Sequence, residues 1–467
     1  MVARVPVTDA DALRGLFAPI VGAEHVLTDR DTVAGYSVDW TGRFVGAAAA
    51  VVRPGTVDEV SRILAVCARE GIALVPQGGN TGLVGGSVPL DGEVVLSLRR
   101  MRSVRLVDAA GGRLVAEAGT TVGEVQRAAA GVGMSYGVDL ASRDAATIGG
   151  TVATDAGGVR TVRYGRTRAQ LLGCEVVLAD GSVIDLTDRP ERDEVGYDLS
   201  NLVCGSEGTL AVVTKVAVRL RRTFPYRVTV MVGLQELGDL AGFVATVREN
   251  VPPVEVVEVM SRQSVELVLR ECDLASPFAD LPRCLVLLEA ADWSDPVDVL
   301  RALSSCPGVS EMAVATDGPR RRLLWQIREL HTEAIARVGV AHKWDVAVPL
   351  DHLADLLDEA EHLVAAHGAG ARLWWFGHLA EGAVHLNVTG LPPEATELDE
   401  RLADAVLRRG GTLCAEHGVG RAKVRWLRQA RTVEEIRAWS LVKRALDPVR
   451  VLNPGVLIPA GGTEASA

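Results

Sequence analysis

The sequence lacks several patterns that mark common classes of protein. Its seven cysteines are scattered and never spaced as Cys-x-x-Cys, which excludes an iron–sulfur cluster held by this chain. No stretch approaches the about 18 uninterrupted apolar residues of a membrane span. Acidic residues outnumber basic ones by 60 to 49, for a net charge of −11. An acidic chain without a basic run is a poor candidate for binding nucleic acid.

Two common nucleotide-binding signatures are also missing. No strict Gly-x-Gly-x-x-Gly follows a predicted strand, and no GxxxxGK[ST] occurs, so dinucleotide-binding Rossmann and Walker folds are not expected. The first residues have no apolar stretch behind a basic one, as secretory signals do, so a cytoplasmic protein with reduced thiols is expected. With 48% hydrophobic residues over 467 positions, the chain can form roughly two to four domains of about 150 residues.

Glycine and histidine are concentrated in different parts of the chain. Residues 71–160 hold 18 of the 48 glycines, whereas eight of the nine histidines lie between 331 and 417. Glycine lets a backbone approach a ligand closely, and histidine supplies metal ligands and proton acceptors near neutral pH. The sequence therefore predicts an N-terminal half that cradles a ligand and a C-terminal half that carries site chemistry.

The first half is expected to mix strands with helices. A capping box at Thr56 opens a predicted helix that stops at Gly71, and the strand 72–76 leads directly into a glycine-rich loop. Glycine-centred turns predict hairpins over 103–119 and 171–186. Longer helices alternate with strands after the boundary near residue 223, which is typical of a ferredoxin-like domain.

Three loops of small residues lie in the first half, at 78–82, 147–158 and 205–210. Glycine and asparagine permit positive φ, so the first loop can turn successive N–H groups towards an anion such as a pyrophosphate. The second loop would let a flat ring or a second phosphate lie against backbone. Each loop alone would more often be structural, but three in one domain favour a large dinucleotide.

Longer motifs then resemble a known family. The first group is PQGGNTGLVGGSVP at 76–89, IGGTVATDAGGVRTVRYG at 148–165 and GSEGTL at 205–210. It resembles the flavin-binding signatures of the vanillyl-alcohol-oxidase (PCMH-type) FAD superfamily. The second group resembles that superfamily's FAD-linked D-2-hydroxyacid dehydrogenases, and its motifs are Trp325-Gln-Ile-Arg328, Lys343-Trp-Asp345, Gly377-His378, His385-Leu-Asn387, Ala415-Glu-His-Gly-Val-Gly420 with Lys423, and Leu452-Asn-Pro-Gly455.

The resemblance implies an α+β fold in which a PCMH-type FAD-binding domain of two subdomains is joined to a ferredoxin-like substrate (cap) domain. A C-terminal segment would return to the flavin domain. The expected boundaries are an N-terminal helical segment at 1–44, the FAD domain at 45–222, the substrate domain at 223–430, the returning segment at 431–460 and a disordered tail at 461–467.

The resemblance also implies how FAD is bound. His25 is the only histidine of the N-terminal half and precedes the flavin loops, so non-covalent FAD is expected. Cys174 and Cys204 sit in apolar strands and are expected to be core residues rather than attachment points. The implied cofactor-binding residues are Pro76, Gly78, Gly79, Asn80, Thr81, Gly82, Gly86, Ser87, Thr147, Gly150, Ala153, Thr154, Gly157, Gly158, Gly208, Val212 and Asn453.

A metal site is expected in the second half. A strand–turn–strand would bring His378 and His385 together, and Glu416 would arrive from a distant loop. Two imidazoles and a carboxylate are a common ligand set for Zn²⁺, with Mn²⁺ the alternative. Family members typically have Gly-Asp-Gly-Asn where this chain has Ala380-Glu381-Gly382-Ala383, and this leaves the orientation of the histidines and the identity of the metal open.

The expected reaction is oxidation of a D-2-hydroxyacid to the 2-oxo acid, with hydride transfer to flavin N5. Arg328, Lys343 and Thr332 would bind the substrate carboxylate, Asn387 would steady the substrate, and His417 would act as general base. D-2-hydroxyglutarate and D-lactate are favoured, followed by larger apolar D-hydroxyacids. An electron-transfer flavoprotein, quinone or cytochrome would reoxidise the flavin.

Aromatic residues at 374–376 precede the histidine turn, and alternation along a strand should turn at least one of them away from the site. Trp344 beside Lys343 would add apolar surface near the reacting carbon. Two other functions stay open: a catalytic subunit of a glycolate-oxidase-like complex, and a metal-dependent hydrolase whose glycine loops are purely structural. A homodimer is one option for the oligomeric state.

Overall fold

The structure is a computed structural model that describes residues 9–251, 254–293, 297–315, 317–368, 370–392 and 395–458. The chain divides into two compact units. Unit 1 comprises 1–158, 165–223 and 416–467, and unit 2 comprises 159–164 and 224–415. This division and the sequence-based boundaries differ over 159–164, 223 and 416–430. The predicted tail at 461–467 lies outside the described residues.

Unit 1 contains a four-stranded sheet in the order β1-β2-β4-β3. Its strands are β1 (Val26–Leu27), β2 (Ala50–Val52), β3 (Leu74–Gln77) and β4 (Val94–Ser97), and β2, β4 and β3 are parallel. Helix α3 (Val57–Glu70) connects β2 to β3. As predicted, Thr56 caps its first turn by accepting from the Glu59 amide, and Gly71 ends it in the left-handed conformation at φ 69°.

The second sheet of unit 1 contains both predicted hairpins. Its order is β5-β6-β10-β8-β9, with β7 also paired to β10. Its strands are β5 (Val104–Asp108), β6 (Arg113–Glu117), β7 (Met134–Tyr136), β8 (Leu171–Val177), β9 (Val183–Asp185) and β10 (Val212–Arg222). One apolar core contains buried residues from both sheets, so the two αβ subdomains share their interior.

The remaining helices of unit 1 are short or lie near the chain ends. Helix α17 begins with a capping box at Thr432 and follows the return of the chain into unit 1. The helices are α1 (Ala10–Val21), α2 (Arg30–Ala34), α4 (Val122–Ala130), α5 (Ile148–Thr154), α7 (Thr167–Gln170), α8 (Leu199–Val203), α16 (Leu427–Ala430) and α17 (Val433–Leu446).

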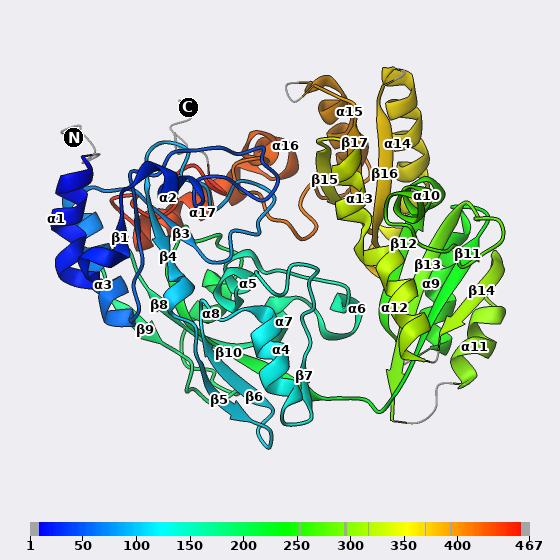
Figure 1. Cartoon of the computed structure of the whole chain (residues 1–467), viewed down its shortest axis with the longest axis horizontal. Helices are drawn as coiled ribbons and strands as arrows, with labels where there is room; N and C mark the ends of the chain where they lie inside the picture. Colours follow the sequence, from blue (N-terminus) through cyan, green and yellow to red (C-terminus); the bar gives the residue numbers. More distant parts are fainter. Residues whose placement is uncertain are drawn as a thin grey trace. The chain divides into compact units, whose positions relative to one another are not determined.

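Unit 2 is built on a seven-stranded antiparallel sheet in the order β14-β11-β13-β12-β16-β17-β15 (Figure 1). The strands are β11 (Tyr226–Leu234), β12 (Val254–Ser261), β13 (Cys284–Asp292), β14 (Val309–Ala315), β15 (His342–Ala347), β16 (Arg372–His378) and β17 (Ala383–Thr389). The predicted strand–turn–strand around His378 and His385 is therefore present, as β16 and β17.

Helices cover both faces of this sheet, as two neighbouring residues of β16 show. Trp375 donates its ring N–H to Glu361 of α14 over 3.0 Å, whereas the Phe376 ring contacts His331 of α13. The expected alternation at 374–376 thus turns Trp375 away from Trp374 and Phe376. The helices are α6 (Thr161–Tyr164), α9 (Asp239–Asn250), α10 (Arg262–Glu271), α11 (Val297–Ser304), α12 (Gly318–Glu329), α13 (His331–Val338), α14 (Leu353–His367) and α15 (Glu397–Leu407).

Within the described ranges, no helix combines the length and the apolar character that crossing a membrane requires.

Candidate active site

Four adjacent strands of unit 2 place polar side chains on one face of the sheet. In the antiparallel register, Lys343 pairs with Asn387, Asp345 with His385, and Glu258 with His378. Residues two apart on a strand, and residues directly opposite across strands, share a face. The shared face carries Lys343, Asp345, His385, Asn387, Trp374, Phe376, His378 and Glu258.

Helix α12 adds a cation to this face. Arg328 is 8% exposed, and its Nε and Nη2 lie 2.7 Å and 2.5 Å from Oε2 of Glu258. Its guanidinium carbon also lies 4.7 Å from the centre of the Phe376 ring, within cation–π range. Arg320, Arg321 and Arg322 at the start of the same helix are exposed. The expected carboxylate binder is therefore held against the sheet rather than in solvent.

The other oxygen of Glu258 accepts from His378, whose Nδ1 lies 2.6 Å away. Burial by itself would raise the pKa of the Glu258 carboxyl, but the Arg328 guanidinium and the His378 hydrogen bond outweigh it and lower that pKa. Glu258 therefore carries negative charge between two donors. Glu258 is not among the residues predicted from the sequence, although two glutamates, Glu255 and Glu258, interrupt the apolar run of 254–260 and a buried charge needs a partner.

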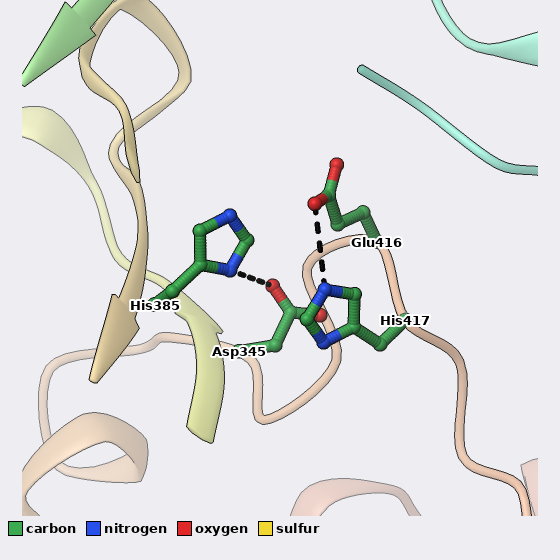
Figure 2. Close-up of side chains that lie close together, drawn as sticks. All are labelled: Asp345, His385, Glu416 and His417. Atoms are coloured by element: carbon green, nitrogen blue, oxygen red, sulfur yellow. Dashed lines mark ion pairs between the residues drawn. The ribbon is translucent and has the colours of Figure 1, made fainter. Parts of the chain in front are cut away.

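Asp345, His385, Glu416 and His417 form a second polar group (Figure 2). One ligand atom from each lies within 4.8 Å of the others. The Nδ1 of His385 is 3.4 Å from Oδ1 of Asp345, and Nε2 of His417 is 3.5 Å from Oε1 of Glu416. Asp345 was not among the predicted site residues, although its position two residues after Lys343 places it on the same strand face.

Local backbone pairing brings Glu416 and His417 to Asp345. Cys414 forms a parallel bridge with Asp345, and the Ala415 amide donates to the Asp345 carbonyl over 3.3 Å. Glu416 follows directly. Further along, the amides of Val419 and Gly420 donate to the buried Glu207 carboxylate over 2.8 Å and 2.7 Å. The residues that flank Glu416 and His417 are thus held by hydrogen bonds, 415 within unit 2 and 419–420 within unit 1.

The four-residue group fits a divalent cation. Around a tetrahedral zinc ion with bonds of about 2.0–2.1 Å, neighbouring donor atoms lie about 3.3 Å apart. The two separations of 3.4 Å and 3.5 Å are close to this value, and histidine nitrogen with carboxylate oxygen suits zinc. All four donor atoms lie within 4.8 Å of one another.

The predicted ligand set is only partly reproduced by this group. His385 and Glu416 belong to it, whereas His378 does not. The His378 ring instead lies against His385, with the ring centres 5.4 Å apart and the planes nearly perpendicular, while its Nδ1 contacts Glu258. All three predicted ligands therefore gather in one region, with Asp345 and His417 beside them.

Two other predicted catalytic residues are Asn387 on β17 and Thr332 on α13. The Asn387 amide donates to the carbonyls of Trp374 and His385, each over 3.3 Å. Thr332 was expected one turn beyond Arg328 on a single helix, but α12 ends at Glu329 and α13 begins at His331. Leu330 between them has ψ near 1°, which breaks the regular helix.

The expectation for Trp344 is wrong in the structure. Trp344 lies on the opposite face of β15 from Lys343, because consecutive strand residues alternate. Its ring N–H donates to Asp399 of α15 over 2.8 Å. It therefore anchors the strand and cannot add apolar surface beside the reacting carbon.

The candidate flavin loops of unit 1 contact one another. A Cβ on Gly78 would lie 2.2 Å from the Thr147 hydroxyl, and one on Gly79 would lie 2.0 Å from the Ala145 carbonyl oxygen. The loop at 78–82 therefore packs on the start of the second loop with no room for a side chain. Glycine is required at these two positions because the two loops pack against each other. The sequence-based expectation was different, namely that the missing side chains leave space for a cofactor.

The third loop and the C-terminal segment join the same group. A Cβ added to Gly208 would lie 3.2 Å from Cγ of Pro76, so Gly208 packs closely against that proline ring. The Asn453 amide donates to the carbonyl of Gly86 over 2.8 Å and to that of Glu207 over 2.7 Å. Hydrogen bonds from Asn453 therefore connect parts of the chain that the sequence assigns to one cofactor.

Within the first loop at 78–82, Asn80 has the positive φ that the sequence permits, whereas Gly78, Gly79 and Gly82 do not. Asn80 has φ 56°, and its side chain donates to Val38 and accepts from the Ser87 hydroxyl, each over 2.8 Å. Gly82 is exposed with no heavy atom within 4 Å of an added Cβ, and Gly86 makes only ordinary contacts. The open side of this loop fits a ligand at Gly82.

The remaining predicted cofactor residues lie on or beside α5 and β10. Thr147 caps α5 by accepting from the Gly150 amide, and Thr154 is exposed at the end of that helix. Gly158 has φ 154° and leaves no room for a side chain beside the Asp139 carbonyl. Thr81 and Ala153 are half-buried, whereas Gly157 and Val212 are buried.

The two cysteines considered for flavin attachment are buried. Burial raises the pKa of the Cys174 thiol to about 11 and that of Cys204 to about 12. Both thiols therefore stay protonated near neutral pH and are poor nucleophiles. Burial agrees with the expected core roles, but only Cys174 lies in a strand, since Cys204 is the C-cap of α8.

Comparison with known proteins defines the class. The family model described as FAD binding domain matches residues 48–187, and the model described as FAD linked oxidases, C-terminal domain matches residues 224–457. The fold is similar to that of 4-ethylphenol oxidase from Gulosibacter chungangensis, with a TM-score of 0.79 and 20% identity over 98% of this chain and 99% of that one. It is also similar to p-cresol methylhydroxylase, with a TM-score of 0.78 and 17% identity over 97% of each chain.

These matches define an FAD-linked oxidase with the expected PCMH-type α+β fold. The chain is also 33% identical to D-2-hydroxyglutarate dehydrogenase of Xanthomonas citri pv. viticola over 94% of this chain and 98% of the relative. It is 34% identical to the mitochondrial D-2-hydroxyglutarate dehydrogenase of Bos taurus, over 98% and 86%. The chain therefore belongs to the FAD-linked D-2-hydroxyacid dehydrogenase family, and the hydrolase alternative is set aside.

Proposed function

We propose that the protein oxidises D-2-hydroxyglutarate to the 2-oxo acid, with D-lactate and larger apolar D-hydroxyacids as further candidates. The observation that carries this is the shared sheet face of unit 2, on which Lys343, Asn387 and His385 lie together with Arg328 above them. Oxidation of a 2-hydroxyacid requires cationic side chains that bind its carboxylate and an imidazole that accepts the proton of its hydroxyl group. The names of the relatives support the first choice of substrate.

Arg328 and Lys343 bind the substrate carboxylate in this proposal. Because Nε and Nη2 of Arg328 already donate to Glu258, the Nη1 side of the guanidinium turns to the substrate. Lys343 contributes a point charge from β15. Asn387, whose amide donates to two backbone carbonyls, keeps its orientation and supports the substrate from the neighbouring strand.

His417 takes the proton of the 2-hydroxyl as general base. The neighbouring Glu416, whose Oε1 lies 3.5 Å from Nε2 of His417, orients the ring. FAD, when bound, supplies the acceptor for the C2 hydride. A divalent ion held by His385, Glu416 and either His378 or Asp345 would, when bound, lower the pKa of the 2-hydroxyl.

An external partner must reoxidise the flavin, and we propose an electron-transfer flavoprotein, a quinone or a cytochrome. Zn²⁺ is the proposed ion, with Mn²⁺ the alternative. A cytoplasmic location is part of the proposal and is tested by cell fractionation.

A dye-reduction screen of the purified protein tests the function. D- and L-2-hydroxyglutarate, D- and L-lactate and glycolate are compared at equal concentration, with and without added Zn²⁺ or Mn²⁺. The expected result is fastest dye reduction with D-2-hydroxyglutarate and a preference for D over L throughout. Faster oxidation of an L-enantiomer, or of glycolate, would overturn the assignment.

A further inference from the structure

Glu258 is a buried residue to which the proposed reaction assigns no chemical step. Its side chain is 1% exposed and lies on β12 directly opposite His378 of β16. One carboxylate oxygen lies 2.6 Å from Nδ1 of His378, and the other lies 2.7 Å and 2.5 Å from Nε and Nη2 of Arg328. A single buried carboxylate thus connects an expected metal ligand with an expected substrate binder.

The hydrogen-bonding capacities of Arg328, Glu258 and His378 determine which ring nitrogen of His378 is protonated. A guanidinium only donates, and an ionised carboxylate only accepts. Nδ1 of His378 therefore carries a hydrogen and donates it in a hydrogen bond to Glu258, and Nε2 is the ring nitrogen with the lone pair. A carboxylate behind an imidazole is a recurrent means of fixing the tautomer that binds a metal.

We propose that Glu258 is a positioning residue that holds His378 in the metal-binding tautomer and at the same time holds Arg328 against the sheet. The inference rests on the proposed function. Asp345 faces His385 across the same sheet face, with 3.4 Å between its Oδ1 and Nδ1 of His385 (Figure 2).

The substitution Glu258→Gln tests this role because an amide cannot serve both partners. Its oxygen must face Arg328, which only donates, so its NH₂ group must face His378. The imidazole then accepts at Nδ1 and carries its proton on Nε2. Titration of the metal-free protein with Zn²⁺ should show a dissociation constant raised by about 10- to 100-fold, with bound FAD unchanged.

The matched control is Glu289→Gln. Glu289 is 2% exposed on the neighbouring strand β13, and its partners are Arg227, Thr229 and Trp325, the last on the same helix as Arg328. Glu289 is likewise a buried carboxylate that bonds an arginine, so a merely structural effect of losing such a group would appear in both variants. Zinc affinity equal to that of the wild type is expected for Glu289→Gln.

Two further measurements separate positioning from stability. Dye reduction by Glu258→Gln should recover as Zn²⁺ is raised, which a general loss of structure would not produce. In a His378→Ala background, Glu258→Gln should cause no additional loss of zinc affinity, because the two residues act through one contact. Should Glu258→Gln fail to fold, Glu258→Asp keeps the charge, withdraws the carboxylate by one methylene and is expected to weaken zinc binding in the same way.

Unchanged zinc affinity in a folded Glu258 variant would overturn the proposal, as would an equal loss in Glu289→Gln. A wild-type protein that binds no Zn²⁺ would overturn both this role and the metal part of the proposed function. Oxidation of D-2-hydroxyacids by that same metal-free protein would show that the dehydrogenase assignment survives. The two failures are therefore distinguishable.

Discussion

Two glycines of the first loop give a quantitative test of how FAD is bound. A Cβ on Gly79 would lie 2.0 Å from the Ala145 carbonyl oxygen, whereas carbon and oxygen normally approach to about 3.3 Å. Gly79→Ala must therefore push two loops apart by about 1.3 Å, and overpacking of this kind costs about 1–3 kcal/mol. We expect a lower urea midpoint of unfolding for Gly79→Ala.

Gly82 is the opposite case, because a Cβ there meets no heavy atom within 4 Å. Gly82→Trp should keep the fold but fill the open side of the loop, where the pyrophosphate is proposed to lie. A tenfold rise in the FAD dissociation constant corresponds to about 1.4 kcal/mol, and at least that loss is expected. Fluorescence titration of the flavin-free protein measures the affinity, and circular dichroism checks the fold.

Gly15→Trp is the control, since Gly15 on α1 is exposed and also has no neighbour within 4 Å of an added Cβ. It should bind FAD as the wild type does. Wild-type FAD affinity in Gly82→Trp would refute the proposed position of the cofactor. An unchanged unfolding midpoint in Gly79→Ala would refute the packing argument.

Three further outcomes follow from the site. His417→Gln should lower turnover by about 10² to 10⁴ while FAD is retained, and wild-type turnover in stopped-flow assays would contradict its role as base. Exhaustive chelation should abolish hydroxyacid oxidation without changing the flavin spectrum, and full activity in metal-free protein, confirmed by elemental analysis, would contradict metal assistance. Burial, reinforced by the Arg328 charge, lowers the pKa of His331 to about 3. As the pH falls below about 6.5, the unfolded chain therefore binds a proton at His331 while the folded protein does not, and the free energy of unfolding decreases. Between about pH 7.5 and about pH 5 the loss is about 2 kcal/mol, and His331→Leu should remove it in urea unfolding; an equal slope in the variant would contradict the assignment.

Local signals predicted much of the architecture. The capping box at Thr56 and the glycine turns led to the correct helix and hairpins, because these features are determined within a few residues. Longer motifs led to the correct fold and family. The reason for Gly78 and Gly79 could not be read from sequence, because it lies in contacts with residues 145–147, far along the chain.

The site was predicted less completely for the same reason. His378, His385 and Arg328 were found as motif residues, but Glu258 becomes visible only when the register of β12 and β16 pairs it with His378. Asp345 stands two residues after Lys343 in the same motif, and only the pairing of β15 with β17 places it opposite His385. Trp344 was assigned to the wrong face although strand alternation already predicts that it points away from Lys343.

The central claim is that this chain passes hydride from a D-2-hydroxyacid to its flavin. Anaerobic mixing of the purified, FAD-loaded protein with D-2-hydroxyglutarate tests it most directly, with the visible flavin absorbance followed in time and the product quantified. We predict rapid bleaching with one 2-oxo acid formed per FAD, and much slower bleaching with the L-enantiomer. An oxidised flavin that persists in the presence of every D-2-hydroxyacid tried would contradict the claim.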